Sequence, residues 1–130
     1  MLEGQVQQQT EKTILVVEDD PAIGDVLTQM IVQETPYQIV LMNTPTEALR
    51  RFREVQPDLV ILNYHLPGMT GIDLYDRLHA FQELEVVPTI MVSATLPTYE
   101  LIKRGIIGIG KPFDVSHLLQ TIERLLASAS

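Results

Sequence analysis

The fold is decided by the stretch PDLVILNYHLPGM, residues 57–69. Its apolar run, residues 59–62, is too short for a helix and lies between Pro57 and the pair Pro67-Gly68. Such a run predicts a strand buried on both faces, as in a parallel sheet covered by helices. The strand ends at Asn63, and in open α/β sheets ligands bind at this end of the strands. We therefore expect Asn63 to lie in the functional site.

Outward from this strand, four more segments have the composition of strands, and helical patterns separate them. The predicted strands are residues 14–17, 37–42, 86–92 and 105–110, and the predicted helices are residues 21–31, 45–55, 70–82, 97–104 and 115–126. Asp20 before Pro21 is a typical helix start, and Asp114 is the expected cap of the last helix. The segment Thr44-Pro45-Thr46-Glu47 is typical of a capping box.

The predicted helices carry apolar residues at helical spacing, which indicates one buried face on each. The longest stripes are Ile23, Val26, Leu27, Met30 and Ile31 in the first helix, and Val115, Leu118, Leu119, Ile122, Leu125 and Leu126 in the last. Strands that alternate with helices predict a parallel sheet with helices on both faces. The expected fold class is α/β, a five-stranded, doubly wound, flavodoxin-like (βα)₅ domain over residues 13–127. Residues 1–12 are a Gln-rich segment that we expect to be a disordered lead-in.

Composition narrows the possible functions. The formal charge of −8 argues against nucleic acid and anionic membranes as direct partners, because phosphate groups would be repelled. The chain has no cysteine, so disulfides and thiolate chemistry are excluded. No apolar stretch is long enough to span a membrane, and a cytoplasmic location is expected.

Polar residues follow the predicted strands at the point where each one ends. Glu18 and Asp19 follow the first strand, Asn63 ends the third, Ser93 ends the fourth and Lys111 follows the fifth. Because the carboxyl ends of parallel strands share one edge, these groups should converge. Two carboxylates with a third oxygen ligand suit Mg²⁺, whereas a hydroxyl and an ammonium suit phosphoryl oxygens. Each residue alone would be ordinary surface or helix-cap chemistry, but together they favour a site.

Four motifs carry a resemblance to a known family: residues 14–21 (ILVVEDDP), residues 57–69, Val92-Ser93-Ala94 and Lys111-Pro112-Phe113. Together they resemble the receiver domain of bacterial two-component response regulators, which accepts a phosphoryl group from a sensor histidine kinase onto an aspartate. The resemblance implies that Glu18, Asp19 and the backbone carbonyl of His65 hold Mg²⁺, with position 63 as a further ligand. It also implies a phosphate pocket formed by Ser93, Ala94 and Lys111, and a cis peptide bond between Lys111 and Pro112.

Three features depart from the family pattern. The phosphoacceptor position holds Asn63, whose carboxamide is neither an anionic nucleophile nor able to form an acyl phosphate. The aromatic switch residue expected three positions before the lysine is Gly108. Only 17 residues separate Ser93 from Lys111, about one helical turn fewer than the family usually has. This shortening falls on the fourth predicted helix, part of the face that such domains use for output.

The resulting prediction is a receiver domain that works by binding, with a weakened Mg²⁺ site and no phosphorylation at Asn63. The expected partners are a sensor histidine kinase or phosphotransfer protein, an effector domain or a second copy of the chain. One alternative is a working receiver with an engineered Asp-to-Asn change at position 63. Another is a flavodoxin-like small-molecule binder or enzyme, which is disfavoured because Glu18-Asp19-Asp20 stands where a glycine-rich phosphate loop would be.

Overall fold

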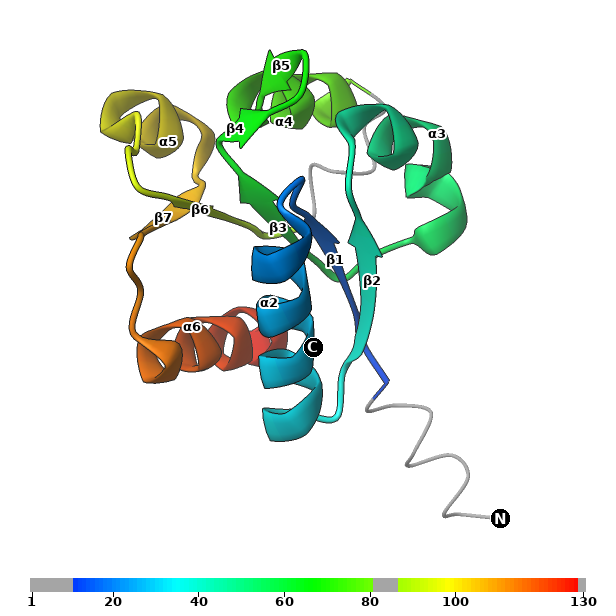
Figure 1. The fold of residues 1–130 in the computed structure, drawn as a ribbon, viewed down its shortest axis with the longest axis vertical. Helices are drawn as coiled ribbons and strands as arrows, with labels where there is room; N and C mark the ends of the chain where they lie inside the picture. The colour runs from blue at the N-terminus through cyan, green and yellow to red at the C-terminus, as the bar shows by residue number, and fades with distance from the viewer. Residues whose placement is uncertain (1–10, 81–86, 129–130) are drawn as a thin grey trace.

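The computed structural model describes residues 11–80 and 87–128. Five strands in these residues form one sheet in the order β2-β1-β3-β6-β7 (Figure 1). The strands are β1 (Thr13–Val17), β2 (Gln38–Met42), β3 (Leu59–Asn63), β6 (Thr89–Ser93) and β7 (Ile107–Gly110). Every neighbouring pair in this sheet is parallel. The predicted five-stranded α/β architecture is therefore confirmed, with β3 at the centre of the sheet.

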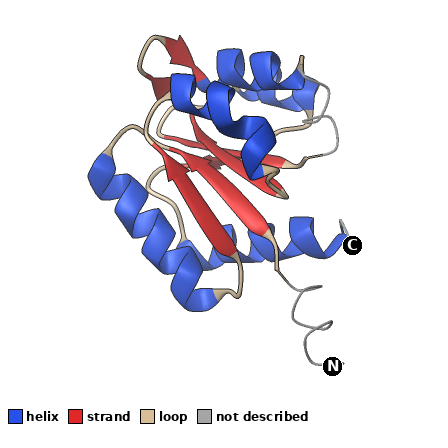
Figure 2. Ribbon diagram, turned by 90° about the vertical axis from the view of Figure 1, so that its right-hand side faces the viewer, coloured by secondary structure: helices blue, strands red, loops and turns tan. Residues whose placement is uncertain are grey.

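Helices cover both faces of the sheet (Figure 2). They are α2 (Pro21–Glu34), α3 (Pro45–Val55), α4 (Gly71–His79), α5 (Thr98–Arg104) and α6 (Val115–Ser128). Buried residues of α2 and α6 belong to the core on one face, and those of α3, α4 and α5 belong to the core on the other. The domain is thus doubly wound, as the sequence predicts.

The apolar run in β3 serves both cores. Leu59 and Ile61 pack into the core with α2 and α6, whereas Val60 and Leu62 pack into the core with α3, α4 and α5. Successive strand residues point to opposite faces of a sheet, so a strand with two covered faces needs an unbroken apolar run. All four side chains are almost completely buried.

Three predicted helix caps are present. Asp20 accepts hydrogen bonds from the backbone at the start of α2, Thr44 accepts from Glu47 N at 3.1 Å, and Asp114 accepts from Ser116 N at 2.9 Å. The capping box at Thr44 is only half formed, because the Glu47 carboxylate instead accepts a hydrogen bond from Arg51. Arg51, one turn further along the helix, therefore competes with the backbone N–H of Thr44 for the Glu47 carboxylate.

Two residues of the predicted apolar stripes were assigned wrongly. Val26 is 60 % exposed and Val115 is 45 % exposed. The sheet covers a narrower strip of α2 than the periodicity indicates, and Gly24 is buried there against Leu41. In α6 the buried polar residue Thr121 is satisfied by its bond to the carbonyl of His117.

A small hairpin was not predicted from the sequence. β4 (His65–Leu66) and β5 (Met69–Thr70) pair antiparallel across Pro67 and Gly68. Gly68 has a φ of 78°, the left-handed conformation that a type II turn requires at its second central position. The sequence indicates a turn here, but two-residue strands are too short to leave a periodic pattern.

Two predicted strands begin later than expected. The strand predicted from residue 86 begins at Thr89, after Pro88, whose carbonyl accepts a hydrogen bond from Val60. The strand predicted from residue 105 begins at Ile107, because Gly105 ends α5 in the left-handed conformation. Of the predicted lead-in over residues 1–12, residues 1–10 lie outside the described residues, as do the predicted helix end at 81–82 and residue 86. The carbonyl of Lys12 accepts a hydrogen bond from Gln38 N at 2.8 Å.

Candidate functional site

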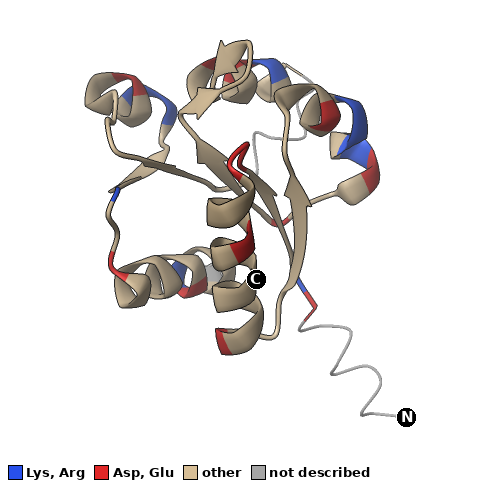
Figure 3. Ribbon diagram, viewed as in Figure 1, with Lys and Arg blue, Asp and Glu red and all other residues tan. Residues whose placement is uncertain are grey.

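Residues from the ends of four strands meet at the carboxyl edge of the sheet. Glu18 follows β1, Asn63 ends β3, Ser93 ends β6 and Lys111 follows β7. Figure 3 shows acidic residues in the turn between β1 and α2 and a basic residue just after β7. This arrangement follows from the parallel sheet, which brings residues more than forty positions apart into one polar cluster.

The amide of Asn63 is the centre of the cluster. Its Nδ2 lies 3.0 Å from Glu18 Oε2, 3.3 Å from Asp19 Oδ1 and 3.1 Å from the backbone carbonyl of His65, and its two hydrogens are shared among these three acceptors. These three acceptors are the oxygens that the family resemblance assigns to a metal. The structure therefore brings them together as predicted, but around a nitrogen atom of the protein.

Glu18 is a buried carboxylate with a full set of partners. Only 2 % of the residue is exposed. Its Oε2 accepts hydrogen bonds from Asp20 N at 3.1 Å and from Asn63, and its Oε1 lies 3.5 Å from Lys111 Nζ. Burial raises the pKa of Glu18, while the Asp20 amide and the Lys111 ammonium partly oppose that effect. The adjacent Asp19 charge acts in the same direction as burial.

The three consecutive acidic residues divide their roles. Glu18 and Asp19 face Asn63, whereas the Asp20 side chain caps α2. Asn43, at the end of the neighbouring strand, donates to the backbone carbonyl of Glu18 at 3.2 Å. Sequence analysis missed Asn43, although a polar residue directly after a strand is a signal that could have found it.

Ser93 and Lys111 are joined through the backbone. Lys111 N donates to Ser93 O at 2.9 Å, and Ser93 Oγ accepts from Thr95 N at 3.3 Å. Ser93 is buried and Ala94 is exposed. Within residues 11–80 and 87–128, no hydrogen bond links the Ser93 side chain to Asn63. The Lys111–Pro112 peptide bond is cis, as predicted.

Gly71 is a further site residue that sequence analysis missed. A Cβ at this position would lie 2.5 Å from the backbone oxygen of Asn63 and 2.8 Å from Met91 Cε. The Gly71 amide also donates to the carbonyl of Tyr64. A side chain would therefore push the start of α4 away from the end of β3. The signal in the sequence is a glycine directly after the helix cap Thr70.

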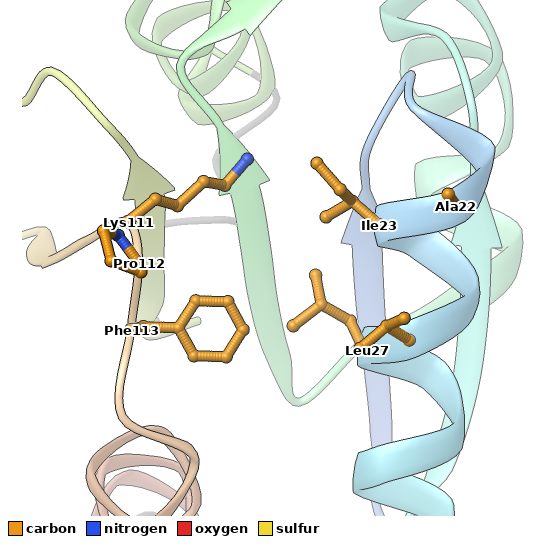
Figure 4. A pocket seen from close by; sticks show the side chains of 7 residues that line it. Ala22, Ile23, Leu27, Lys111, Pro112 and Phe113 are labelled. Atoms are coloured by element: carbon orange, nitrogen blue, oxygen red, sulfur yellow. The ribbon is translucent and has the colours of Figure 1, made fainter.

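An apolar cavity lies beside the site. It has a volume of about 380 Å³ and is lined by Ala22, Ile23, Val26 and Leu27 of α2 and by Lys111, Pro112 and Phe113. Figure 4 shows Ile23, Leu27 and the Phe113 ring lining the space, with the Lys111 nitrogen pointing away from that ring. The aliphatic part of the Lys111 side chain thus borders the cavity, whereas its ammonium group forms an ion pair with Glu18.

At Gly108 of β7, the neighbouring side chains are leucines. A Cβ at Gly108 would lie 2.8 Å from Leu101 Cδ1 and 3.2 Å from Leu96 Cδ1. Arg104, at the end of α5, forms ion pairs at 2.8 Å with Asp76 of α4 and Glu100 of α5. Two leucines therefore occupy the space next to the position of the missing aromatic, and the ion pair of Arg104 with Asp76 joins α5 to α4.

Comparisons with known proteins bear on the family and the fold of the chain. The family model described as the response regulator receiver domain matches residues 14–123. The chain is 36 % identical over 89 residues to the DNA-binding response regulator MtrA of Mycolicibacterium smegmatis, covering 68 % of this chain and 37 % of that protein. It is 32 % identical over 120 residues to the phosphate regulon transcriptional regulatory protein PhoB of Rhizobium meliloti, covering 89 % and 52 %. This chain therefore spans about half the length of such relatives or less.

A solved structure shares the fold of this chain. The CheY-like response regulator receiver domain protein from Methanospirillum hungatei superposes with a TM-score of 0.82 at 27 % identity, covering 91 % of this chain and 95 % of that one. In the part of the chain that the structure describes, no helix is long and apolar enough to cross a membrane.

Proposed function

This chain belongs to the response regulator receiver domain family of two-component signalling, and we propose that it acts as a regulatory receiver that cannot be phosphorylated at Asn63. The observation that carries this proposal is the chemistry at the acceptor position. A carboxamide has no anionic oxygen to attack phosphorus, and the Asn63 nitrogen is engaged with three acceptors. The domain would then signal by binding rather than by phosphotransfer.

The remaining pocket residues support a receiver that has lost one group. Ser93 and Lys111 supply the hydroxyl and ammonium of a phosphate pocket, with Ala94 next to them, and Glu18 and Asp19 supply the acidic pair. A natural loss is favoured by the leucines packed next to Gly108, because an engineered change at Asn63 would leave the rest of the domain unaltered. An engineered Asp-to-Asn change is the second candidate, favoured by the intact Glu18, Asp19, Ser93 and Lys111.

The proposed partners are a sensor histidine kinase or a phosphotransfer protein, with an effector domain or a second copy of this chain as the recipient of the signal. MtrA is named a DNA-binding regulator, and the chain matches only part of it. For residues 13–127 we retain the prediction of no direct contact with nucleic acid, because the formal charge of the chain is −8.

The test is phosphoryl loading of two proteins. The wild-type domain and Asn63→Asp are incubated with acetyl phosphate and Mg²⁺, and phosphorylation is followed by intact-protein mass spectrometry. We expect no added phosphate on the wild type and stoichiometric addition to Asn63→Asp, since the other pocket groups are present. Phosphorylation of the wild type at any pocket residue would overturn the proposal. A variant that also stays unlabelled would show that the pocket has lost competence beyond position 63.

A further inference from the structure

The acidic pocket is arranged around a nitrogen atom, which does not fit the Mg²⁺ that the family implies. Mg²⁺ takes oxygen ligands at about 2.0–2.1 Å in near-octahedral geometry. Here Glu18 Oε2, Asp19 Oδ1 and the His65 carbonyl lie 3.0–3.3 Å from Asn63 Nδ2, as hydrogen-bond acceptors. Within the described residues, no group of three His, Asp or Glu side chains could hold a metal ion.

The neighbours of Asn63 determine which end of its amide faces the pocket. Glu18 Oε2, Asp19 Oδ1 and the carbonyl of His65 surround this end of the amide as hydrogen-bond acceptors. The NH₂ group is the part of the carboxamide that can donate to them, whereas the Oδ1 atom in the same place would face three other oxygens. The inward position of Nδ2 therefore agrees with the three acceptors that surround it.

We propose that the Asn63 NH₂ group takes the place of the divalent cation, so that the pocket is complete without a metal. Glu18 is the strongest support. Its Oε2 is bonded to Asp20 N and Asn63 Nδ2, and its Oε1 is paired with Lys111. A buried carboxylate that lacked such partners would destabilise the fold, and here every partner is supplied by the protein. Asn63 is therefore a structural donor rather than a weak metal ligand.

A cation could enter this pocket only by displacing the amide. Asn63 would have to rotate, and its bonds to Glu18, Asp19 and His65 would break. Each hydrogen bond to a charged group corresponds to at least about a tenfold change in an equilibrium constant. We therefore expect Mg²⁺ to bind Asn63→Asp and to leave the wild type unbound over the same concentration range, a difference of at least about tenfold in affinity.

The first test needs only the unmutated protein. Thermal melting is compared in EDTA and in excess Mg²⁺, and the Asn63 side-chain amide signals are followed by NMR during a Mg²⁺ titration. The proposal expects an unchanged melting temperature and unchanged amide signals. A Mg²⁺-dependent rise in melting temperature, or displacement of the Asn63 amide signals, would overturn it. Both readouts are independent of phosphorylation, so they can fail while the proposed function holds.

The second test uses Asn63→Asp with Asn43→Asp as its matched control. Asn63→Asp places a third carboxylate among Glu18, Asp19 and the His65 carbonyl, so it should melt several degrees lower in EDTA and recover in Mg²⁺. Asn43→Asp adds the same charge nearby, but among the described residues Asn43 donates to the backbone carbonyl of Glu18 and to no carboxylate. It should show no comparable recovery in Mg²⁺. Equal responses of the wild type and Asn63→Asp to Mg²⁺ would contradict the proposal.

Discussion

At the β1–β3 side of the sheet edge, polar groups converge around Asn63, whereas at the β6–β7 side leucine side chains pack next to Gly108. On the first side, Asn63 departs from the residues that the family resemblance implies for phosphotransfer, whereas Glu18, Asp19, Ser93 and Lys111 match them. On the second side the space beside the missing aromatic is occupied, and α5 is tied to α4 through Arg104. We therefore expect one substitution at Asn63 to restore phosphorylation, but not the conformational response at the β6–β7 side.

The two sides also differ in how they tolerate added atoms. A Cβ at Gly71 would meet the backbone oxygen of Asn63, which cannot move without shifting β3. A Cβ at Gly108 would meet methyl groups at the ends of Leu96 and Leu101, which can rotate. On the polar side, backbone atoms that cannot move therefore limit the space for an added atom. On the apolar side, the limit is set by side chains that can repack.

The largest expected effect tests this difference. Gly71→Ala should lower the free energy of unfolding by about 1–3 kcal/mol, because the methyl group would overpack the junction of β3 and α4. Gly108→Ala, the matched control, should cost less than about 1 kcal/mol, since leucine methyls give way and the strand loses a flexible glycine. Urea unfolding of the three proteins measures both values. Equal losses of unfolding free energy in Gly71→Ala and Gly108→Ala would show that the two sides do not differ in how they tolerate added atoms.

A smaller effect concerns the ion pairs that hold α5. The hydrogen bond from Arg104 lowers the pKa of Asp76. Asp76 is half exposed, so Asp76→Asn should cost only about 0.5–1 kcal/mol at neutral pH. A carboxyl whose pKa is lower in the folded state contributes stability above its unfolded pKa, and that contribution is lost as pH falls through the folded value.

The difference in unfolding free energy between wild type and Asp76→Asn should therefore be constant near neutral pH. It should begin to shrink below about pH 4 and be lost as the pH falls through the lowered folded pKa of Asp76. Unfolding free energies measured across this range provide the check. Asp25→Asn, at an exposed carboxylate on α2, is the control for the removal of a surface charge away from Arg104. A difference that grew in acid would mean that Asp76 does not stabilise the α4–α5 contact as an anion.

The smallest expected effect is at the output side. In receivers, as the family resemblance implies, a switch aromatic follows the hydroxyl residue toward the phosphate. Gly108 has no side chain to move, and Leu96 and Leu101 occupy the adjoining space. We expect Asn63→Asp loaded with beryllofluoride to show chemical-shift changes near residue 63 and almost none over residues 97–126. Any dimer should form equally with and without loading. Large shifts in that range, or loading-dependent sedimentation, would show that the output response survives.

Much of the fold could be predicted because its signals are local. The apolar run before Asn63, the caps Asp20 and Asp114 and the regular alternation of elements each depend on residues close together in the chain. The convergence of Glu18, Asp19, Asn63 and Lys111 could also be predicted, because parallel strands place their carboxyl ends at one edge. For these features the sequence alone determined which residues meet.

Only the tertiary structure decided how those residues interact. The inward direction of the Asn63 NH₂ group depends on acceptors up to 45 positions away, and no local pattern encodes that orientation. The exposure of Val26 depends on how much of α2 the sheet covers, and the packing next to Gly108 depends on Leu101 of α5 and Leu96 of the loop before it. Sequence patterns specify which side chains face a neighbour, whereas the distances and directions of their atoms are set only when the neighbours are in place.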